Sequence, residues 1–173
     1  MKNKYLLLGI GFALFFISGC ASTTKLFYYE TDPSSSSYEK NSIICVVDNF
    51  GSMSVVSING NKVELGGVLD SNKTIILKPG IVNIILHLYI NKDRGLTDHT
   101  FDPIEIDLQP GQIYFIMPKS KGDNFIADSA AVLAMDFILK IYEGDKLESY
   151  GLKNSDLNHL KDLYKDIINK HNK

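Results

Sequence analysis

The sequence predicts a mainly β protein, a small antiparallel β-sandwich followed by an amphipathic carboxyl-terminal helix. Three observations support this prediction. Short apolar runs recur between residues 41 and 151, several with strictly alternating side chains. Turn signals built from glycine, asparagine or proline separate these runs at regular intervals. From residue 152 onward the apolar spacing changes to that of a helix.

The expected strands of the sandwich follow from these runs. The Asn59-Gly60 dipeptide joins two of them and favours a tight hairpin, because both residues tolerate positive φ. The run at 81–90 has one fully apolar row and one mixed row, which indicates a sheet that is covered on one face. The expected strands cover residues 43–48, 53–58, 62–65, 73–77, 81–90, 104–108, 112–117, 137–142 and 146–150.

Three connections in this region also attract attention. The tetrapeptides 77–80 and 108–111 share the pattern L-x-P-G, and we expect them to form equivalent hairpin turns. Residues 91–103 are expected to form a polar loop. Residues 123–135 fit either a meandering loop or, as we favour, a partly helical excursion.

The last segment has an apolar stripe at helical spacing, formed by Leu157, Leu160, Leu163, Tyr164, Ile167 and Ile168. Ser155 suits the N-cap of this helix, and Asp156 suits its positive end. We expect a helix of about fifteen residues within 152–173 that packs its stripe on the sandwich, since an isolated helix of that length is marginal in water. Docking of a partner is the alternative role for the stripe.

The first twenty residues indicate the cellular location of the protein. Lys2 and Lys4 precede an apolar stretch at 5–17, which is too short to span a bilayer as a helix and is typical of a secretory signal peptide. Residues 17–20 (ISGC) resemble the lipobox of bacterial lipoproteins. The resemblance implies a lipid on the sulfur of Cys20, cleavage between Gly19 and Cys20, and a fatty acid such as palmitate on the new amino terminus. An ordinary signal peptide or signal anchor with an incidental cysteine is the alternative.

Cleavage would remove residues 1–19 and leave 154 of the 173 residues, which is the size of one domain. Residues 20–40 then form a lipidated cysteine and a flexible tether, marked by four consecutive serines at 34–37. The apolar residues 26–29 interrupt this tether and could add an edge strand or simply dock on the domain. Ala21 lacks the aspartate associated with inner-membrane retention, so in a host with two membranes the resemblance favours the outer membrane, facing the periplasm.

Three further stretches resemble a loose class of small bacterial lipoproteins of unknown function. They are the hairpin at 57–63, the L-x-P-G turn at 77–80 and the G-x-x-Y sequence at 111–114, within a region from Ser42 to Phe115. The resemblance implies a small sandwich in the transthyretin-like or immunoglobulin-like style. It carries over no catalytic residues.

Composition and motifs argue against several functions. The net charge is −2 and no cluster of Lys and Arg occurs, so we expect no nucleic-acid partner. Cys45 lies in an apolar strand and is expected to be a buried hydrophobic side chain rather than a reactive thiol. The densest polar group comprises Asp93, Arg94, Asp98, His99, Asp102 and Glu105. Its oxygens could hold Ca²⁺, but we favour a solvated acidic loop. We expect no metal, no cofactor and no catalytic residue, and we expect His87 to be a surface histidine.

The sequence therefore favours a membrane-anchored envelope lipoprotein whose sandwich is a non-enzymatic binding or scaffolding module. Expected partners are the membrane, through the lipid on Cys20, and other envelope proteins or cell-wall polymers. The alternatives are an envelope enzyme whose site is assembled from non-local residues, and a carbohydrate or cell-wall binding module.

Overall fold

The computed structural model describes residues 25–31, 40–47, 52–65, 72–89, 98–120 and 137–171. The expected signal peptide, the lipidation site at Cys20 and the expected helical excursion at 123–135 lie outside these ranges. Among the described residues, no helix is both long and apolar enough to span a bilayer.

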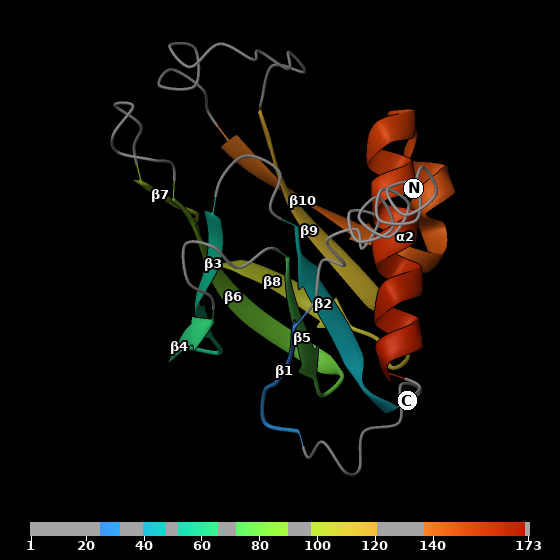
Figure 1. Ribbon diagram of the computed structural model, residues 1–173. Helices are drawn as coiled ribbons and strands as arrows, with labels where there is room; N and C mark the ends of the chain where they lie inside the picture. Colours follow the sequence, from blue (N-terminus) through green and yellow to red (C-terminus); the bar gives the residue numbers. More distant parts are fainter. Residues whose placement is uncertain are drawn as a thin grey trace, which may run out of the picture.

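Two five-stranded sheets pack face to face, which confirms the expected small β-sandwich (Figure 1). Sheet A contains, in spatial order, β1 Lys25–Tyr28, β5 Lys73–Leu77, β2 Ser42–Val46, β9 Ile113–Ser120 and β10 Phe137–Glu143. Sheet B contains, in spatial order, β4 Asn61–Leu65, β3 Ser52–Ile58, β6 Gly80–Tyr89 and β7 Asp98–Thr100, and β8 Ile104–Leu108 also pairs with β6.

The core between the sheets comes from the alternating strands. In β6 the predicted apolar row is buried at Val82, Ile84, Leu86 and Leu88, while Asn83 on the opposite row is exposed. The inner faces of sheets A and B together form one buried cluster. Sheet B is therefore covered on one face, as the alternation predicts.

Sheet A departs from the expected antiparallel pattern. The pairs β1–β5 and β2–β9 are parallel, so this sheet is mixed. All five residues of β2 and all five residues of β5 are buried, because sheet B covers one face of sheet A and a helical layer covers the other.

The helix α2 Asn154–His171 forms that outer layer with the 3₁₀ helix η6 Gly144–Tyr150 (Figure 1). Its residues Leu160, Leu163 and Ile167 are buried against the outer face of sheet A. The stripe thus packs on the sandwich as expected. The expected N-cap is wrong, because the helix begins at Asn154, and the Lys153 carbonyl already accepts the Leu157 N–H at 2.9 Å.

The Asn59-Gly60 hairpin is confirmed, with φ of 50° and 76° between β3 and β4. The two L-x-P-G turns have equivalent roles, but they are not hairpins. Residues 77–80 lead from β5 in sheet A to β6 in sheet B, and residues 108–111 lead from β8 in sheet B to β9 in sheet A. Gly80 pairs with Leu108, so both sheet-changing corners lie side by side.

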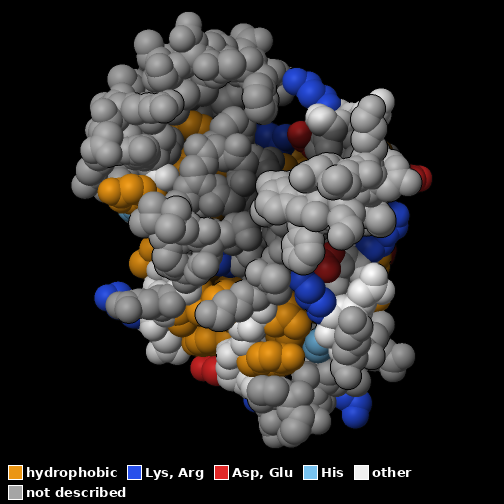
Figure 2. Space-filling view, viewed as in Figure 1, with side chains coloured by type: hydrophobic (Ala, Val, Ile, Leu, Met, Phe, Trp, Pro, Cys, Tyr) orange, Lys and Arg blue, Asp and Glu red, His pale blue; other side chains and the backbone are white. Residues whose placement is uncertain are grey.

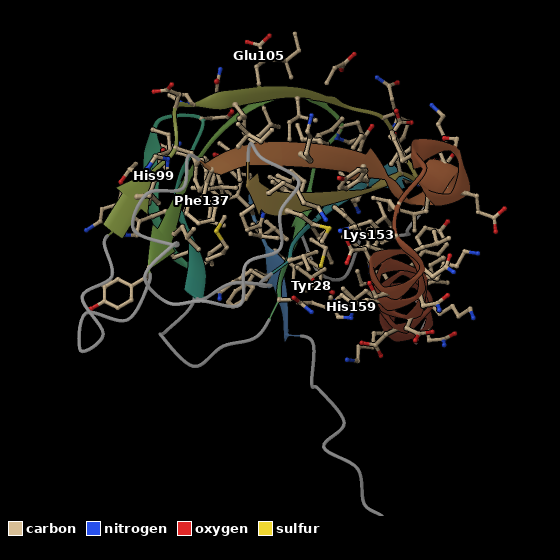
Figure 3. All side chains as sticks on the ribbon, turned by 90° about the horizontal axis from the view of Figure 1, so that it is seen from above. Tyr28, His99, Glu105, Phe137, Lys153 and His159 are labelled. Carbon is tan, nitrogen blue, oxygen red and sulfur yellow. The ribbon has the colours of Figure 1, made fainter. Side chains whose placement is uncertain are left out.

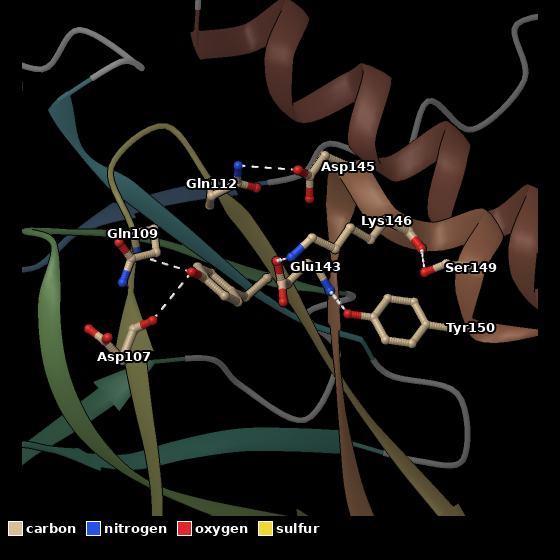
Figure 4. Close-up of polar contacts among 9 residues, drawn as sticks. Asp107, Gln109, Gln112, Glu143, Asp145, Lys146, Ser149 and Tyr150 are labelled. Carbon is tan, nitrogen blue, oxygen red and sulfur yellow. Dashed lines mark hydrogen bonds and ion pairs between the residues drawn. The ribbon is translucent and has the colours of Figure 1, made fainter.

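A tyrosine fixes the second corner. The Tyr114 hydroxyl accepts the Gln109 N–H at 2.9 Å and donates to the Asp107 carbonyl at 3.3 Å (Figure 4). This is the arrangement known as a tyrosine corner in β-sandwiches, in which the hydroxyl bonds to backbone a few residues upstream. It gives a physical reason for the tyrosine in the G-x-x-Y sequence.

Three further expectations need correction. Residues 146–150 belong to the 3₁₀ helix η6 and not to a strand. Within the expected polar loop at 91–103, residues 98–100 form the strand β7. Residues 25–28 form the edge strand β1, the first of the two roles considered for residues 26–29, so they do not belong to a flexible tether.

Candidate functional site

An open groove with a volume of about 730 Å³ lies between η6 and α2. One wall is η6, and the other is the middle of α2, with Lys161, Tyr164 and Lys165. Volumes of about 300–1,000 Å³ are typical of ligand sites. The size and the mixed lining therefore make this groove the candidate binding site.

The 3₁₀ helix is fixed in place at its middle and at both ends. Leu147 is buried in the cluster beneath α2. The Tyr150 hydroxyl accepts the Glu143 N–H at 3.2 Å, which joins the end of η6 to its beginning (Figure 4). Gly151 then leaves the segment with φ of 62°, a conformation that favours glycine. The wall of the groove is thus held by packing and by hydrogen bonds.

Gly144 allows the two walls to approach each other. A Cβ atom at this position would lie 2.6 Å from both Cδ2 and Cε2 of Tyr164 and 3.1 Å from the Ile113 carbonyl oxygen. Real Cβ atoms essentially never show contacts under 3.0 Å. The ring of Tyr164 therefore packs directly on the Gly144 backbone and forms an aromatic floor for the groove.

Charged groups line the rim in pairs. Lys161 on α2 forms an ion pair with Glu148 on η6 at 2.5 Å, and this pair links the two walls. The hydrogen bond from Lys161 lowers the pKa of Glu148. Lys146 of η6 forms a second ion pair with Glu143, and the hydrogen bond between them raises the pKa of Lys146.

Two further hydrogen bonds involve side chains or backbone of η6. The amide of Gln112 donates to the Asp145 carboxylate at 3.3 Å, and Ser149 donates to the Lys146 carbonyl at 2.7 Å (Figure 4). The groove thus combines a partly apolar floor with ionic and hydrogen-bonding groups. Such a surface can recognise a partner by shape and by polar contacts.

The sequence singled out Gly19 and Cys20 as a processing and lipidation site, and Cys45 as a second cysteine. Gly19 and Cys20 lie outside the described residues. Cys45 is a free, fully buried thiol that accepts a weak hydrogen bond from Thr74 at 3.7 Å. Burial raises its pKa to about 12. The expected role of Cys45 as a buried hydrophobic side chain is therefore confirmed.

The polar loop residues do not gather into a site in the part that the structure describes. His99 is exposed and its ring meets the Phe101 ring edge-on at 4.6 Å. Asp102 and Glu105 are exposed, and Glu105 points away from the sandwich in Figure 3. Among the described residues, no group of three or more His, Cys, Asp or Glu could hold a metal ion.

His87 has a structural contact within sheet B. Its Nδ1 atom lies 2.8 Å from the Thr100 hydroxyl oxygen, across the β6–β7 pair. Its side chain is only partly exposed. The contact therefore helps to fasten the short strand β7.

The groove residues were missed in the sequence because residues 146–150 fit a strand as well as a helix. One usable signal was present, since Gly144 directly follows a strand and precedes a polar stretch. Comparisons with protein-family models, curated proteins and solved structures found no match.

Proposed function

We propose that this chain is a membrane-anchored lipoprotein of the bacterial envelope, with a sandwich that acts as a non-enzymatic binding or scaffolding module. The observation that carries the proposal is the amino-terminal sequence. Lys2 and Lys4, a short apolar stretch and the ISGC sequence ending at Cys20 follow one another in the order that lipidation requires. Two or more acyl chains on Cys20 would give stable anchoring without a spanning helix.

The η6–α2 groove supports the binding part of this proposal. Its walls are fixed by buried Leu147 and by the Tyr150 hydrogen bond, so a partner would meet a preformed surface. Glu148 is 77% exposed on the rim and can reach a partner. The paired charges favour another envelope protein or a polar cell-wall polymer over an apolar ligand. In a host with two membranes, Ala21 favours the outer membrane facing the periplasm.

The anchor is tested by metabolic labelling with a fatty acid. Cys20→Ala should remain an unprocessed precursor without label, because the thiol is the point of acylation. Cys45→Ala is the matched control, since it removes the other cysteine and should keep the label. Equal label on Cys20→Ala and the parent would refute lipidation at this residue.

The groove is tested separately by photo-crosslinking in intact bacterial cells that produce the protein. A photoreactive amino acid at Glu148 should give discrete adducts. The same amino acid at the exposed position Glu105, on the outer face of sheet B, should not. Lys161→Ala should weaken the adducts at position 148 by removing a cationic group from the α2 wall of the groove. Identical adducts at Glu148 and Glu105 would argue against the groove as the binding site.

A further inference from the structure

The distance between the proposed lipid and the folded domain is short. Strand β1 begins at Lys25, five residues after Cys20. A chain spans at most about 3.3–3.6 Å per residue in any conformation, so Cys20 and Lys25 are separated by at most about 18 Å. An uninterrupted tether of twenty residues could reach about 70 Å, which is far more.

Strand β1 is also an edge of the sandwich. It pairs with β5 and lies at one side of sheet A, while β10 lies at the opposite side. Neighbouring strands are about 4.8 Å apart, so the four intervals from β1 to β10 amount to about 19 Å. The connection from Cys20 is shorter than this width. If the β10 edge faced the membrane, the connection could not reach the lipid.

The β1 edge is firmly joined to the rest of the sandwich. The Tyr29 N–H donates to the Ile76 carbonyl at 3.0 Å. The Tyr29 hydroxyl donates to the Ile58 carbonyl at 3.1 Å and accepts from the Asn61 amide at the same distance. These bonds tie the end of β1 to both sheets. A lipid that holds β1 therefore holds the whole domain.

Apolar side chains are accessible on this edge. Tyr28 is 38% exposed, and among the described residues only Ile81 and Tyr150 are other large hydrophobic side chains classed as exposed. Leu26 and Tyr29 beside it are only partly buried. Figure 2 shows hydrophobic side chains gathered on this face, in the region where Figure 1 places β1 and β5. Tyrosine is enriched where protein meets the membrane interface.

We propose that the β1 edge of the sandwich rests on the surface of the membrane that holds the lipid on Cys20. This inference rests on the proposed lipoprotein function. The β10 edge then points away from the membrane. The 3₁₀ helix η6 follows directly after β10. The wall of the groove that η6 forms therefore lies toward the β10 edge and stays open to a partner.

The orientation can be measured with single tryptophans, because the chain contains none. Tyr28→Trp places the probe on the β1 edge, and Lys140→Trp places it on the exposed part of β10 in the same sheet. Each lipidated full-length protein would be reconstituted into vesicles of phosphatidylethanolamine and phosphatidylglycerol that contain a spin-labelled headgroup lipid. The expected result is a larger loss of fluorescence for Tyr28→Trp than for Lys140→Trp.

A longer connection in both tryptophan variants tests the cause of this orientation. Insertion of about 20 Gly and Ser residues between Cys20 and Lys25 would extend the reach by up to about 70 Å. The difference between the two probes should then shrink. Equal quenching at the two positions without the insertion, stronger quenching at Lys140→Trp, or an unchanged difference after the insertion would each overturn the inference. Fatty-acid labelling of the same samples separates these results from a failure of the proposed function, which would leave the proteins without lipid.

Discussion

Truncation of Leu160 should destabilise the domain strongly, because this side chain is fully buried between α2 and sheet A. Leu160 is completely buried, in the same cluster as Cys45 and Phe115 of sheet A. In Leu160→Ala, three carbon atoms are lost at about 0.8 kcal/mol each, or about 2.4 kcal/mol in transfer free energy. The cavity left behind adds to this loss, so we expect about 3 kcal/mol, within the range of about 2–5 kcal/mol seen for such changes.

The loss is measured as a shift in the thermal midpoint. For a domain of this size, 1 kcal/mol corresponds to roughly 2–4 °C, so Leu160→Ala should melt about 6–12 °C below the parent. The measurement uses the chain from residue 20 onward with Cys20→Ser, which removes the lipid and leaves the described residues unchanged. Circular dichroism follows the melt.

His159→Ala is the matched control for Leu160→Ala. His159 is the preceding residue of the same helix and is exposed, so its truncation should change the stability by no more than about 0.5 kcal/mol. A melting temperature for Leu160→Ala within about a degree of the parent would refute the reasoning. It would mean that the stripe is available to a partner and contributes little to the isolated domain.

Three further changes test other contacts. Gly144→Ala should cost about 1–3 kcal/mol by displacing the Tyr164 ring, and Tyr164→Ala in the same chain should remove most of that penalty in a double-mutant cycle. Tyr114→Phe should cost about 1–3 kcal/mol in urea unfolding, because the buried corner loses the hydroxyl that accepts the Gln109 N–H. Burial raises the pKa of Cys45 from 9.0 to about 12, so its contribution to stability is complete below pH 9 and is lost as the pH rises toward 12. The slope is at most about 1.4 kcal/mol per pH unit, and urea unfolding of Cys45→Ala at increasing pH should show a smaller alkaline loss than the parent.

The sheets could be predicted from the sequence because their signals are local. Alternation along 81–90 located β6 and its buried face, and Asn59-Gly60 located the β3–β4 hairpin. The helical stripe of α2 was equally clear, since leucines such as Leu160 recur at helical spacing. In each case side-chain periodicity or turn chemistry alone determines the local structure.

Errors arose where long-range contacts decide the structure. Residues 146–150 follow a turn and could continue as a strand, but Leu147 is buried under α2 and the segment becomes η6. The L-x-P-G sequence indicates a turn without indicating which strands it joins, so the change of sheet at 77–80 and 108–111 was not predictable. Strand β1 has only four residues, and its pairing with β5 lies about 48 positions along the chain.

The three-layer arrangement nevertheless left a readable signal. Residues 43–47 and 75–77 are apolar without alternation, whereas the strands of a sheet with one solvated face alternate. A strand without a polar face needs cover on both sides. The sandwich supplies only one cover, from sheet B, and α2 has the only apolar helical stripe in the described part of the chain. The non-alternating strands need a cover on their outer face, and the apolar stripe of α2 needs a surface on which to pack, so each buries the other. This argument predicts α2 on the outer face of β2 and β5 rather than on sheet B, and that placement leaves η6 beside α2 to form the second wall of the groove.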